Sequence, residues 1–121
     1  MSLTADQRAA IDTTEEVDIY TSAGGRMIGT IIWVVVSEGE VYVRSVNAED
    51  GQWYQRARSN PSVSLDVNGE RIDFQAVHIG DDATIEAVSD ALRAKYRPGA
   101  SLDAMVRDEV LGHTLRLDPV D

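Results

Sequence analysis

The sequence predicts a domain of the α+β class that is mainly β, and three features of the chain lead to this prediction. About six short runs alternate apolar and polar residues, as expected for strands with one buried face. Turn signals separate these runs, the strongest being Asn68-Gly69, because both residues tolerate the positive φ angles of a type I′ hairpin turn. Few segments show the wider spacing of helices. A small barrel fits this pattern, and a flat sheet with helices on one face fits it nearly as well.

The composition limits the class of protein. The 121 residues suffice for a single domain, 1–121, with one hydrophobic core. The chain has no cysteine, which excludes disulfides, thiolate metal sites and cysteine nucleophiles. Its formal net charge of −10 argues against nucleic acid as a partner. No apolar run is long enough to span a membrane and no signal-peptide pattern is present, so we expect a cytoplasmic protein without a membrane partner.

The N-terminal part is predicted to form a helix and two strands. Thr4 and Gln7 have the spacing of a capping box, which predicts a short helix to about Asp12. A half-buried strand follows over 17–21, and the next strand includes the run 31–36, which is apolar on both faces. Such a run is typical of a central barrel strand or of a strand covered by a partner subunit. We therefore expect a homodimer.

The middle of the chain is predicted to form a strand and a short helix. A hairpin loop over 37–40 leads into a strand over 41–46. A short helix follows over 52–58, and Asn60-Pro61 ends it because the residue before a proline avoids helical conformation.

The C-terminal half is predicted to hold a hairpin, two helices and a closing strand. The hairpin joins strands over 63–67 and 72–78. A helix with one apolar face runs over 81–97, and a second runs over 101–111. The closing strand lies over 113–117.

Recognisable catalytic motifs are absent from the sequence. It contains no phosphate-binding GxxxxGK[ST] loop, no GxGxxG and no HExxH. His78 and His113 are interpreted as partly buried histidines, with a metal-binding or acid–base role as the alternative. Ser45 has no evident base nearby in the sequence. We therefore assign no catalytic residue and no metal site from the sequence.

The segment 41–60 is the most informative part of the chain for function. It holds three arginines and the adjacent aromatic pair Trp53-Tyr54 against two acidic residues, within a strongly acidic chain. A local basic spot of this kind suits a small anionic ligand, such as a phosphate-bearing cofactor. The alternative is structural: the arginines face solvent, and Trp53 and Tyr54 belong to the core. Trp33 is interpreted as a residue of the core or of a subunit interface.

Several runs in the sequence resemble the flavin-binding split β-barrels, which include pyridoxamine-phosphate-oxidase-like proteins and deazaflavin-dependent nitroreductases. These runs are Ile32–Val36, Gly39, Val41–Val46, Gly51–Tyr54 and Asn60-Pro61. The pair Trp53-Tyr54 followed by Asn60-Pro61 is similar to the WYxNLxANP stretch of the deazaflavin branch. The whole pattern is most similar to a small bacterial branch of unknown function.

The resemblance implies a six-stranded split β-barrel with short peripheral helices, assembled as a homodimer with two cofactor sites at the interface. The implied cofactor is FMN, or alternatively a deazaflavin. Its ring would lie against the strand that contains Thr30, Ile31, Ile32 and Trp33. Its phosphate would be held by the end of the next strand and by the helix that follows, through Arg44, Ser45, Val46, Gln52, Trp53 and Arg56.

The leading hypothesis is thus an oxidoreductase that binds FMN or a deazaflavin and transfers hydride to a small organic substrate. The alternative is a non-enzymatic dimer of the same fold that has lost the cofactor and binds another small anion or a protein partner. Two departures motivate this alternative. Gln52-Trp53 stands where the oxidase branch usually has a basic pair, and Glu49 and Asp50 would repel a phosphate. A third hypothesis is an acidic α+β binding module unrelated to flavoproteins.

Overall fold

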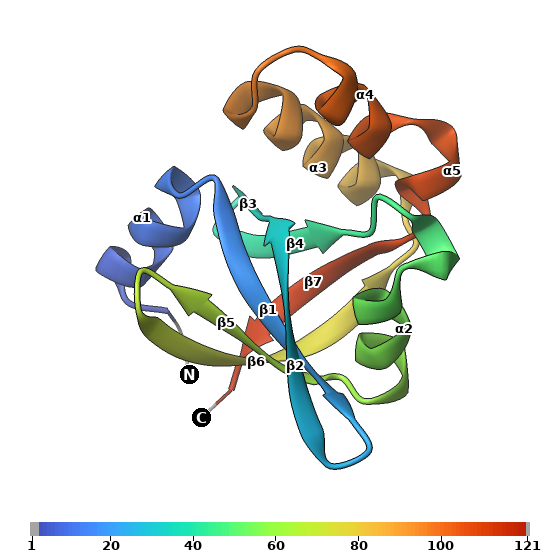
Figure 1. The fold of residues 1–121 in the computed structure, drawn as a ribbon. Coiled ribbons are helices and arrows are strands. Elements are labelled where there is room, and N and C mark those ends of the chain that lie inside the picture. Colours follow the sequence, from blue (N-terminus) through green and yellow to red (C-terminus); the bar gives the residue numbers. More distant parts are fainter. Residues whose placement is uncertain (1–2, 121) are drawn as a thin grey trace.

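The computed structural model describes residues 3–120, and in that range it has seven strands and five α-helices (Figure 1). The strands are β1 (Glu16–Ala23), β2 (Arg26–Trp33), β3 (Val35–Ser37), β4 (Glu40–Arg44), β5 (Ser62–Val67), β6 (Glu70–Ile79) and β7 (Thr114–Pro119). The helices are α1 (Ala5–Thr13), α2 (Gln52–Ser59), α3 (Asp82–Lys95), α4 (Ala100–Val106) and α5 (Asp108–Leu111), and a 3₁₀ turn, η1 (Ala48–Asp50), precedes α2. The α+β class predicted from the sequence is confirmed.

The strands form one antiparallel sheet with the order β2-β1-β5-β6-β7-β4-β3, and this sheet is rolled into a half-barrel. Its two outermost strands, β2 and β3, follow one another in the chain with only Val34 between them. A flat sheet of this order would put those two strands at opposite edges. The sheet therefore has to curl until its edges meet, which rules out the flat arrangement that fitted the sequence nearly as well.

The predicted number of six strands is wrong by one, because the apolar run expected over 31–36 is divided at Val34. The backbone N–H of Val34 donates to the hydroxyl of Tyr96 at 3.2 Å, and its carbonyl oxygen accepts from Nζ of Lys95 at 2.6 Å. Side chains thus take the place of a neighbouring strand at this residue. The run continues as β3 on the other edge of the sheet.

Apolar side chains gather in two clusters. The larger lies within the barrel and receives alternate residues of the strands, among them Ile19 of β1, Leu65 of β5 and Leu117 of β7, all fully buried. The smaller lies between β3, β4 and the helices, with Val88 of α3 and Leu102 of α4 as members. In Figure 1, α3, α4 and α5 form one group over β3 and β4. These three helices are called the helical cap below.

Two local signals in the sequence are confirmed by the backbone. The main-chain N–H of Gln7 donates to Oγ1 of Thr4 at 3.0 Å, and the main-chain N–H of Thr4 donates to Oε1 of Gln7 at 2.9 Å, which is the capping box. Asn68 and Gly69 have φ angles of 52° and 87°, as a type I′ turn requires. The short helix after β4 is also present, as α2.

The single helix predicted over 101–111 is wrong, since the structure has two short helices there. Arg107, between α4 and α5, is extended, with φ −70° and ψ 155°. Its guanidinium donates to the carbonyl oxygen of Val46 at 2.7 Å, which ties this break to the loop after β4. None of the helices within residues 3–120 has the length and apolarity needed to cross a membrane.

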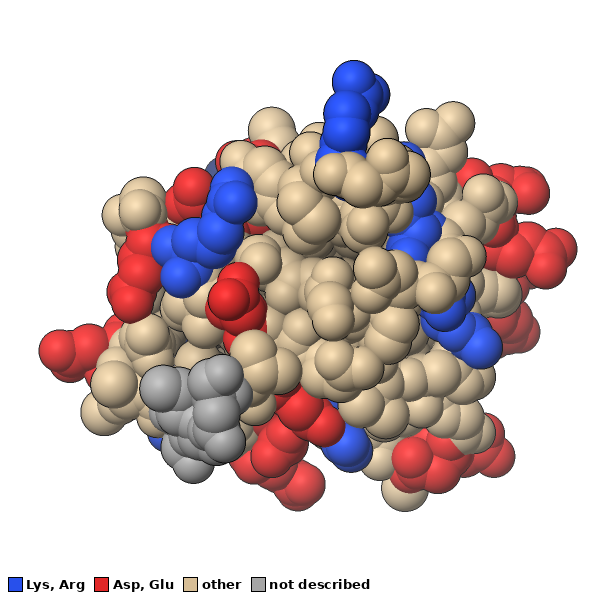
Figure 2. Space-filling view, turned by 90° about the horizontal axis from the view of Figure 1, so that it is seen from below, with Lys and Arg blue, Asp and Glu red and all other residues tan. Residues whose placement is uncertain are grey.

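The acidic side chains are dispersed over the face seen from below in Figure 2. Acidic and basic side chains alternate around its rim, and the middle of this face carries few charges. The net charge of −10 is therefore not concentrated in one patch on this face.

Candidate functional site

A hollow of about 510 Å³ opens between β2, the chain that leads from β4 to α2, and α4, and we call it the β2–α4 pocket. Its volume lies within the range of roughly 300–1,000 Å³ found for small-molecule sites. Seven of the ten residues predicted from the sequence to bind a cofactor line it: Thr30, Ile31, Ile32, Trp33, Arg44, Val46 and Trp53. The other three, Ser45, Gln52 and Arg56, do not. The sequence therefore pointed to one region of the fold, although these residues come from three separate elements.

The walls of the β2–α4 pocket are largely aromatic and aliphatic. Both tryptophans of the chain, Trp33 at the end of β2 and Trp53 in the first turn of α2, line it. The indole of Trp33 is stacked on the ring of Tyr96, with the ring centroids 3.8 Å apart and the planes within 3° of parallel. Trp53 meets Tyr54 edge to face at 6.1 Å. Flat apolar walls of this kind suit a planar ligand.

Arg44 is the most unusual residue of the pocket, because it is a charged side chain only 2% exposed. Its Nε donates to Oγ1 of Thr114 at 2.8 Å, and Nη1 donates to Oγ of Ser89 at 2.9 Å and to the carbonyl oxygen of Met105 at 3.1 Å. Nη2 donates to the carbonyl oxygen of Ile85 at 3.0 Å. Four of the five N–H groups of the guanidinium are thus engaged. Arg44 joins β4 to β7 and to the helical cap.

The charge of Arg44 has no acidic partner among residues 3–120, since all four of its acceptors are neutral. Burial, helped by the positive charge of Arg93, lowers the pKa of Arg44 to about 10. The group is therefore still protonated at pH 7. Met105 lies in the last turn of α4, so its carbonyl oxygen also presents the negative end of a helix dipole to the guanidinium. A buried cation beside a pocket is suited to an anionic ligand.

Ser45 and Gly51 fix the turn that starts α2. The hydroxyl of Ser45 donates to the carbonyl oxygen of Ala48 at 2.8 Å, so its hydrogen is already used. A Cβ at position 51 would lie 2.3 Å from Oγ of Ser45, which explains why a glycine stands there. Gly51 is the N-cap of α2 and supplies no capping side chain, so the first N–H groups of this helix keep their capacity for an anion. Gln52, in the first turn, is exposed.

Arg56 brings a second positive charge close to the pocket without lining it. It lies one turn after Trp53 on α2, and its Nε donates to Oγ1 of Thr21 at 2.8 Å. Its Nη2 lies 3.5 Å from Oγ1 of Thr30, a residue of the pocket wall. The sole acidic residue in the pocket lining within residues 3–120 is Glu16. The two positive charges of Arg44 and Arg56 therefore exceed the one negative charge of Glu16 at this pocket.

Sequence reasoning missed the wall that α4 contributes. This wall is formed by Ala100, Ser101, Ala104 and Met105. Three of these are small residues within one turn of helix, which leaves room beside β2. That spacing is visible in the sequence, but it identifies a pocket only once α4 is known to face β2 across the hollow.

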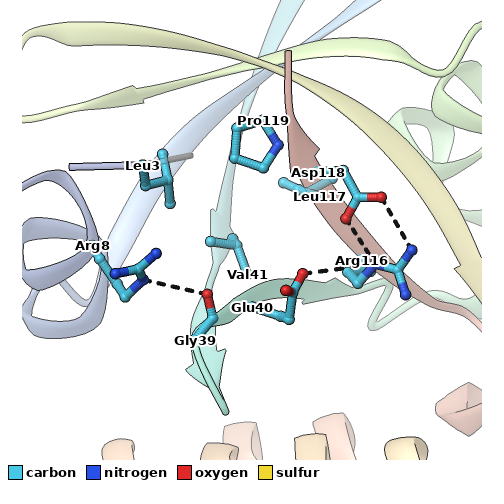
Figure 3. A pocket seen from close by; sticks show the side chains of 9 residues that line it. All are labelled: Leu3, Arg8, Gly39, Glu40, Val41, Arg116, Leu117, Asp118 and Pro119. Atoms are coloured by element: carbon cyan, nitrogen blue, oxygen red, sulfur yellow. Dashed lines mark hydrogen bonds and ion pairs between the residues drawn. The ribbon is translucent and has the colours of Figure 1, made fainter. Parts of the chain in front are cut away.

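A second hollow of similar volume, about 510 Å³, lies between α1, the β3–β4 turn and the end of β7 (Figure 3). Nε of Arg8 donates to the carbonyl oxygen of Gly39 at 3.3 Å. Arg116 binds both carboxylate oxygens of Asp118, at 2.7 and 3.1 Å, and lies 3.9 Å from Glu40. The single positive charge of Arg116 is thus paired with neighbouring carboxylates, whereas that of Arg44 has no acidic partner within residues 3–120. The β2–α4 pocket is the better candidate for an anionic ligand.

Neither histidine lines the β2–α4 pocket. His78 is exposed, contrary to the prediction that it is partly buried, and its Nε2 lies 2.8 Å from the carbonyl oxygen of Gly112. His113 is half-buried and packs edge to face on Tyr54 at 5.2 Å, and its Nδ1 has no hydrogen-bond partner within residues 3–120. The pocket thus has no histidine available for proton transfer.

Residues 7–117 match the model of a family described as an uncharacterized protein conserved in bacteria (DUF2255). The chain belongs to this family. The match spans nearly all of the sequence, including the half-barrel and the helical cap. No curated protein matches the chain.

The fold is shared with solved structures of low sequence identity. Rv2991, a conserved hypothetical protein of Mycobacterium tuberculosis, is 16% identical with a TM-score of 0.75, over 100% of this chain and 82% of that one. HutZ, the heme storage protein from Vibrio cholerae, is 15% identical (TM-score 0.69, 100% and 92% covered). The FAD binding protein from Mycobacterium smegmatis is 18% identical (TM-score 0.66, 100% and 93% covered). The resemblance to the flavin-binding split β-barrels, seen first in the sequence, is confirmed for the fold.

Proposed function

We propose that this protein binds a flavin-type cofactor in the β2–α4 pocket and serves as an oxidoreductase acting on a small organic substrate. The cofactor we propose is FMN, with a deazaflavin as the alternative. The observation that carries the proposal is the combination, in one pocket, of both tryptophans with the buried Arg44, which has no acidic partner within residues 3–120. A flat ring with an anionic tail is the class of ligand that meets both features.

The residues present fit such a cofactor in part. The ring would pack on Trp33 and the aliphatic residues of β2, where the pocket is apolar. The anionic tail would be held by the uncapped start of α2 and by Arg56, with Arg44 contributing its charge and its one remaining N–H. When bound, a flavin supplies the hydride chemistry, while the protein supplies position and electrostatics. The chain itself would orient the ring and exclude water from its apolar face.

We further propose that two copies of the chain form a dimer that closes the pocket. Ile31 and Val46 line the pocket and are 65% and 39% exposed, and Met27, on the same strand as Ile31, is 46% exposed. Apolar side chains this exposed on one strand favour a contact with another surface. A second copy laid against β2 would cover Ile31 and complete the open side of the pocket.

Tryptophan fluorescence tests the proposal directly, because both tryptophans of the chain line the pocket. We expect saturable quenching on titration with FMN or with coenzyme F420. Trp33→Phe and Trp53→Phe serve as matched variants, since each leaves a single reporter in the pocket. If neither compound quenches the emission of the wild type, and the purified protein carries no flavin absorbance, the proposed cofactor is refuted.

A second candidate function is favoured because the side chains predicted to bind a phosphate already form hydrogen bonds within the protein. Four N–H groups of Arg44 and the hydroxyl hydrogen of Ser45 bind the protein itself, and Gln52 lies off the pocket. These bonds favour a non-enzymatic dimer that has lost the cofactor and binds another small anion or a protein partner. In that case FMN and F420 would not bind, whereas phosphate or pyrophosphate would raise the Tm of the wild type.

A further inference from the structure

Tyr96, which follows α3, forms the back of one wall of the β2–α4 pocket. Its side chain is 7% exposed and covers one face of the Trp33 indole, in a nearly parallel stack with 3.8 Å between centroids. Trp33 in turn lines the pocket, whereas Tyr96 does not. A ligand ring that packs on Trp33 therefore meets an indole whose other face is already supported. The sequence placed Tyr96 only within the helix predicted over 81–97, with no role at a site.

The position of Tyr96 is fixed by main-chain groups of Val34, between β2 and β3, and of Glu15, just before β1. Its hydroxyl accepts the N–H of Val34 at 3.2 Å and donates to the carbonyl oxygen of Glu15 at 2.5 Å. Burial raises the pKa of Tyr96 to about 12, so the phenol keeps the proton that it donates. These bonds hold the residue directly after Trp33 and the residue directly before β1. The tyrosine ring and the tryptophan ring are thereby locked to each other.

Lys95, the single lysine of the chain, also binds the main chain at Val34. Its Nζ donates to the carbonyl oxygens of Val34 at 2.6 Å and of Ile11 at 3.0 Å, and lies 5.4 Å from the centre of the Tyr96 ring. The end of α3 thus contributes one cation and one aromatic ring to a stack that ends at Trp33. Two electron-rich rings stacked in parallel favour an electron-poor ring on the remaining face of the indole.

We propose that Trp33 is the platform on which the pocket seats a planar, electron-poor ring, and that Tyr96 is the positioning residue that orients this platform. The proposal rests on the proposed function, because it assumes that the ligand carries such a ring. According to this proposal, Tyr96 affects which ligand the pocket accepts although it does not line the pocket. Loss of the Tyr96 ring leaves Trp33 unsupported on one face, so that its indole can rotate out of the orientation that receives the ligand.

The experiment compares Tyr96→Leu with Tyr96→Phe, which keeps the stacked ring and loses only the hydroxyl. Tyr42→Leu is the matched control, since Tyr42 is an equally buried tyrosine of the same apolar cluster that does not line the pocket. Near-ultraviolet circular dichroism of the ligand-free proteins reports the Trp33–Tyr96 stack. We expect its signal to persist in Tyr96→Phe and Tyr42→Leu and to disappear in Tyr96→Leu.

Titration with FMN and with F420 then measures the consequence for binding. We expect Tyr96→Leu to bind the accepted compound about 2- to 13-fold more weakly, the range that corresponds to one aromatic stacking contact. Tyr96→Phe and Tyr42→Leu should stay within about twofold of the wild type. The fluorescence of the bound isoalloxazine or deazaflavin should be less quenched in Tyr96→Leu, because quenching needs the ring held against the indole. If Tyr96 only stabilised the fold, Tyr42→Leu would lose as much ligand affinity and quenching as Tyr96→Leu.

The outcomes separate this proposal from the proposed function. If the wild type binds one of the two compounds and Tyr96→Leu matches Tyr42→Leu in affinity and quenching, the positioning role is refuted and the cofactor pocket stands. If the wild type binds neither compound, the proposed function fails, and the platform fails with it. Trp33→Leu keeps the test decisive should Tyr96→Leu not fold. Unchanged affinity in Trp33→Leu, followed through Trp53, would overturn the platform.

Discussion

Replacing Arg44 by methionine tests whether this buried arginine stabilises the fold through its hydrogen bonds. Methionine keeps most of the volume of the side chain and removes the charge and all the donors. The change leaves Oγ of Ser89 and the carbonyl oxygens of Ile85 and Met105 without the guanidinium, whereas Oγ1 of Thr114 still donates to the carbonyl oxygen of Leu111 at 2.9 Å.

Two opposing terms decide the magnitude. A hydrogen bond to a charged group contributes roughly 1.5–3 kcal/mol, and four such bonds are lost. Removing a buried cation also relieves a desolvation cost of several kcal/mol, the same burial that lowers the pKa of Arg44. We expect the hydrogen bonds to win, because all four acceptors are well placed, and the free energy of unfolding to fall by about 2–4 kcal/mol.

Urea unfolding of Arg44→Met, with an unchanged m-value, measures this loss. Arg93→Met is the matched control, since the Arg93 side chain is 53% exposed and pairs with Asp90 on the surface of α3. That change should alter the free energy of unfolding by no more than about 0.5 kcal/mol. An Arg44→Met protein as stable as the wild type would refute the reasoning. It would mean that the desolvation cost of burying the charge equals the stabilisation that its four hydrogen bonds contribute.

Three further changes test other parts of the structure. The raised pKa of Tyr96 means that the folded protein holds the phenol proton more tightly than the unfolded chain does. The contribution of this proton to the free energy of unfolding is therefore complete below pH 10 and is lost as the pH rises towards about 12. Tyr96→Phe should flatten the fall in the free energy of unfolding between pH 10 and 12, and an equally steep curve in this variant would contradict the reasoning. Gly51→Ala should destabilise the protein by about 1–3 kcal/mol, because its Cβ would meet Oγ of Ser45, and the double variant Ser45→Ala with Gly51→Ala should recover most of the loss in thermal unfolding. Ile31→Glu should convert the proposed dimer into a monomer in sedimentation, since it puts a charge on the exposed strand face, and a wild type that is monomeric at micromolar concentration would count against the dimer.

Much of the fold could be predicted from the sequence because its signals are local. The capping box at Thr4 and Gln7, the turn at Asn68-Gly69 and the alternation of β1 each depend on residues within a few positions of one another. The sequence also indicated, by resemblance, residues that lie together in the structure: Trp33 at the end of β2 and Trp53 at the start of α2 line one pocket. The wall from α4 was not indicated, because no local pattern shows which strand a helix will cover.

The sequence alone determined the class of the fold, the order of its elements apart from the breaks at Val34 and Arg107, and the presence of a basic, aromatic segment in an acidic chain. Only the tertiary structure decided what Arg44 binds, because its partners Ile85, Ser89, Met105 and Thr114 lie 41 to 70 residues away in the chain. It also decided where the apolar run divides. Val34 leaves the sheet because Lys95 and Tyr96, some sixty residues later, supply the hydrogen bonds that a neighbouring strand would otherwise make. Such pairings depend on the packing of the whole chain and leave no periodic signal in its sequence.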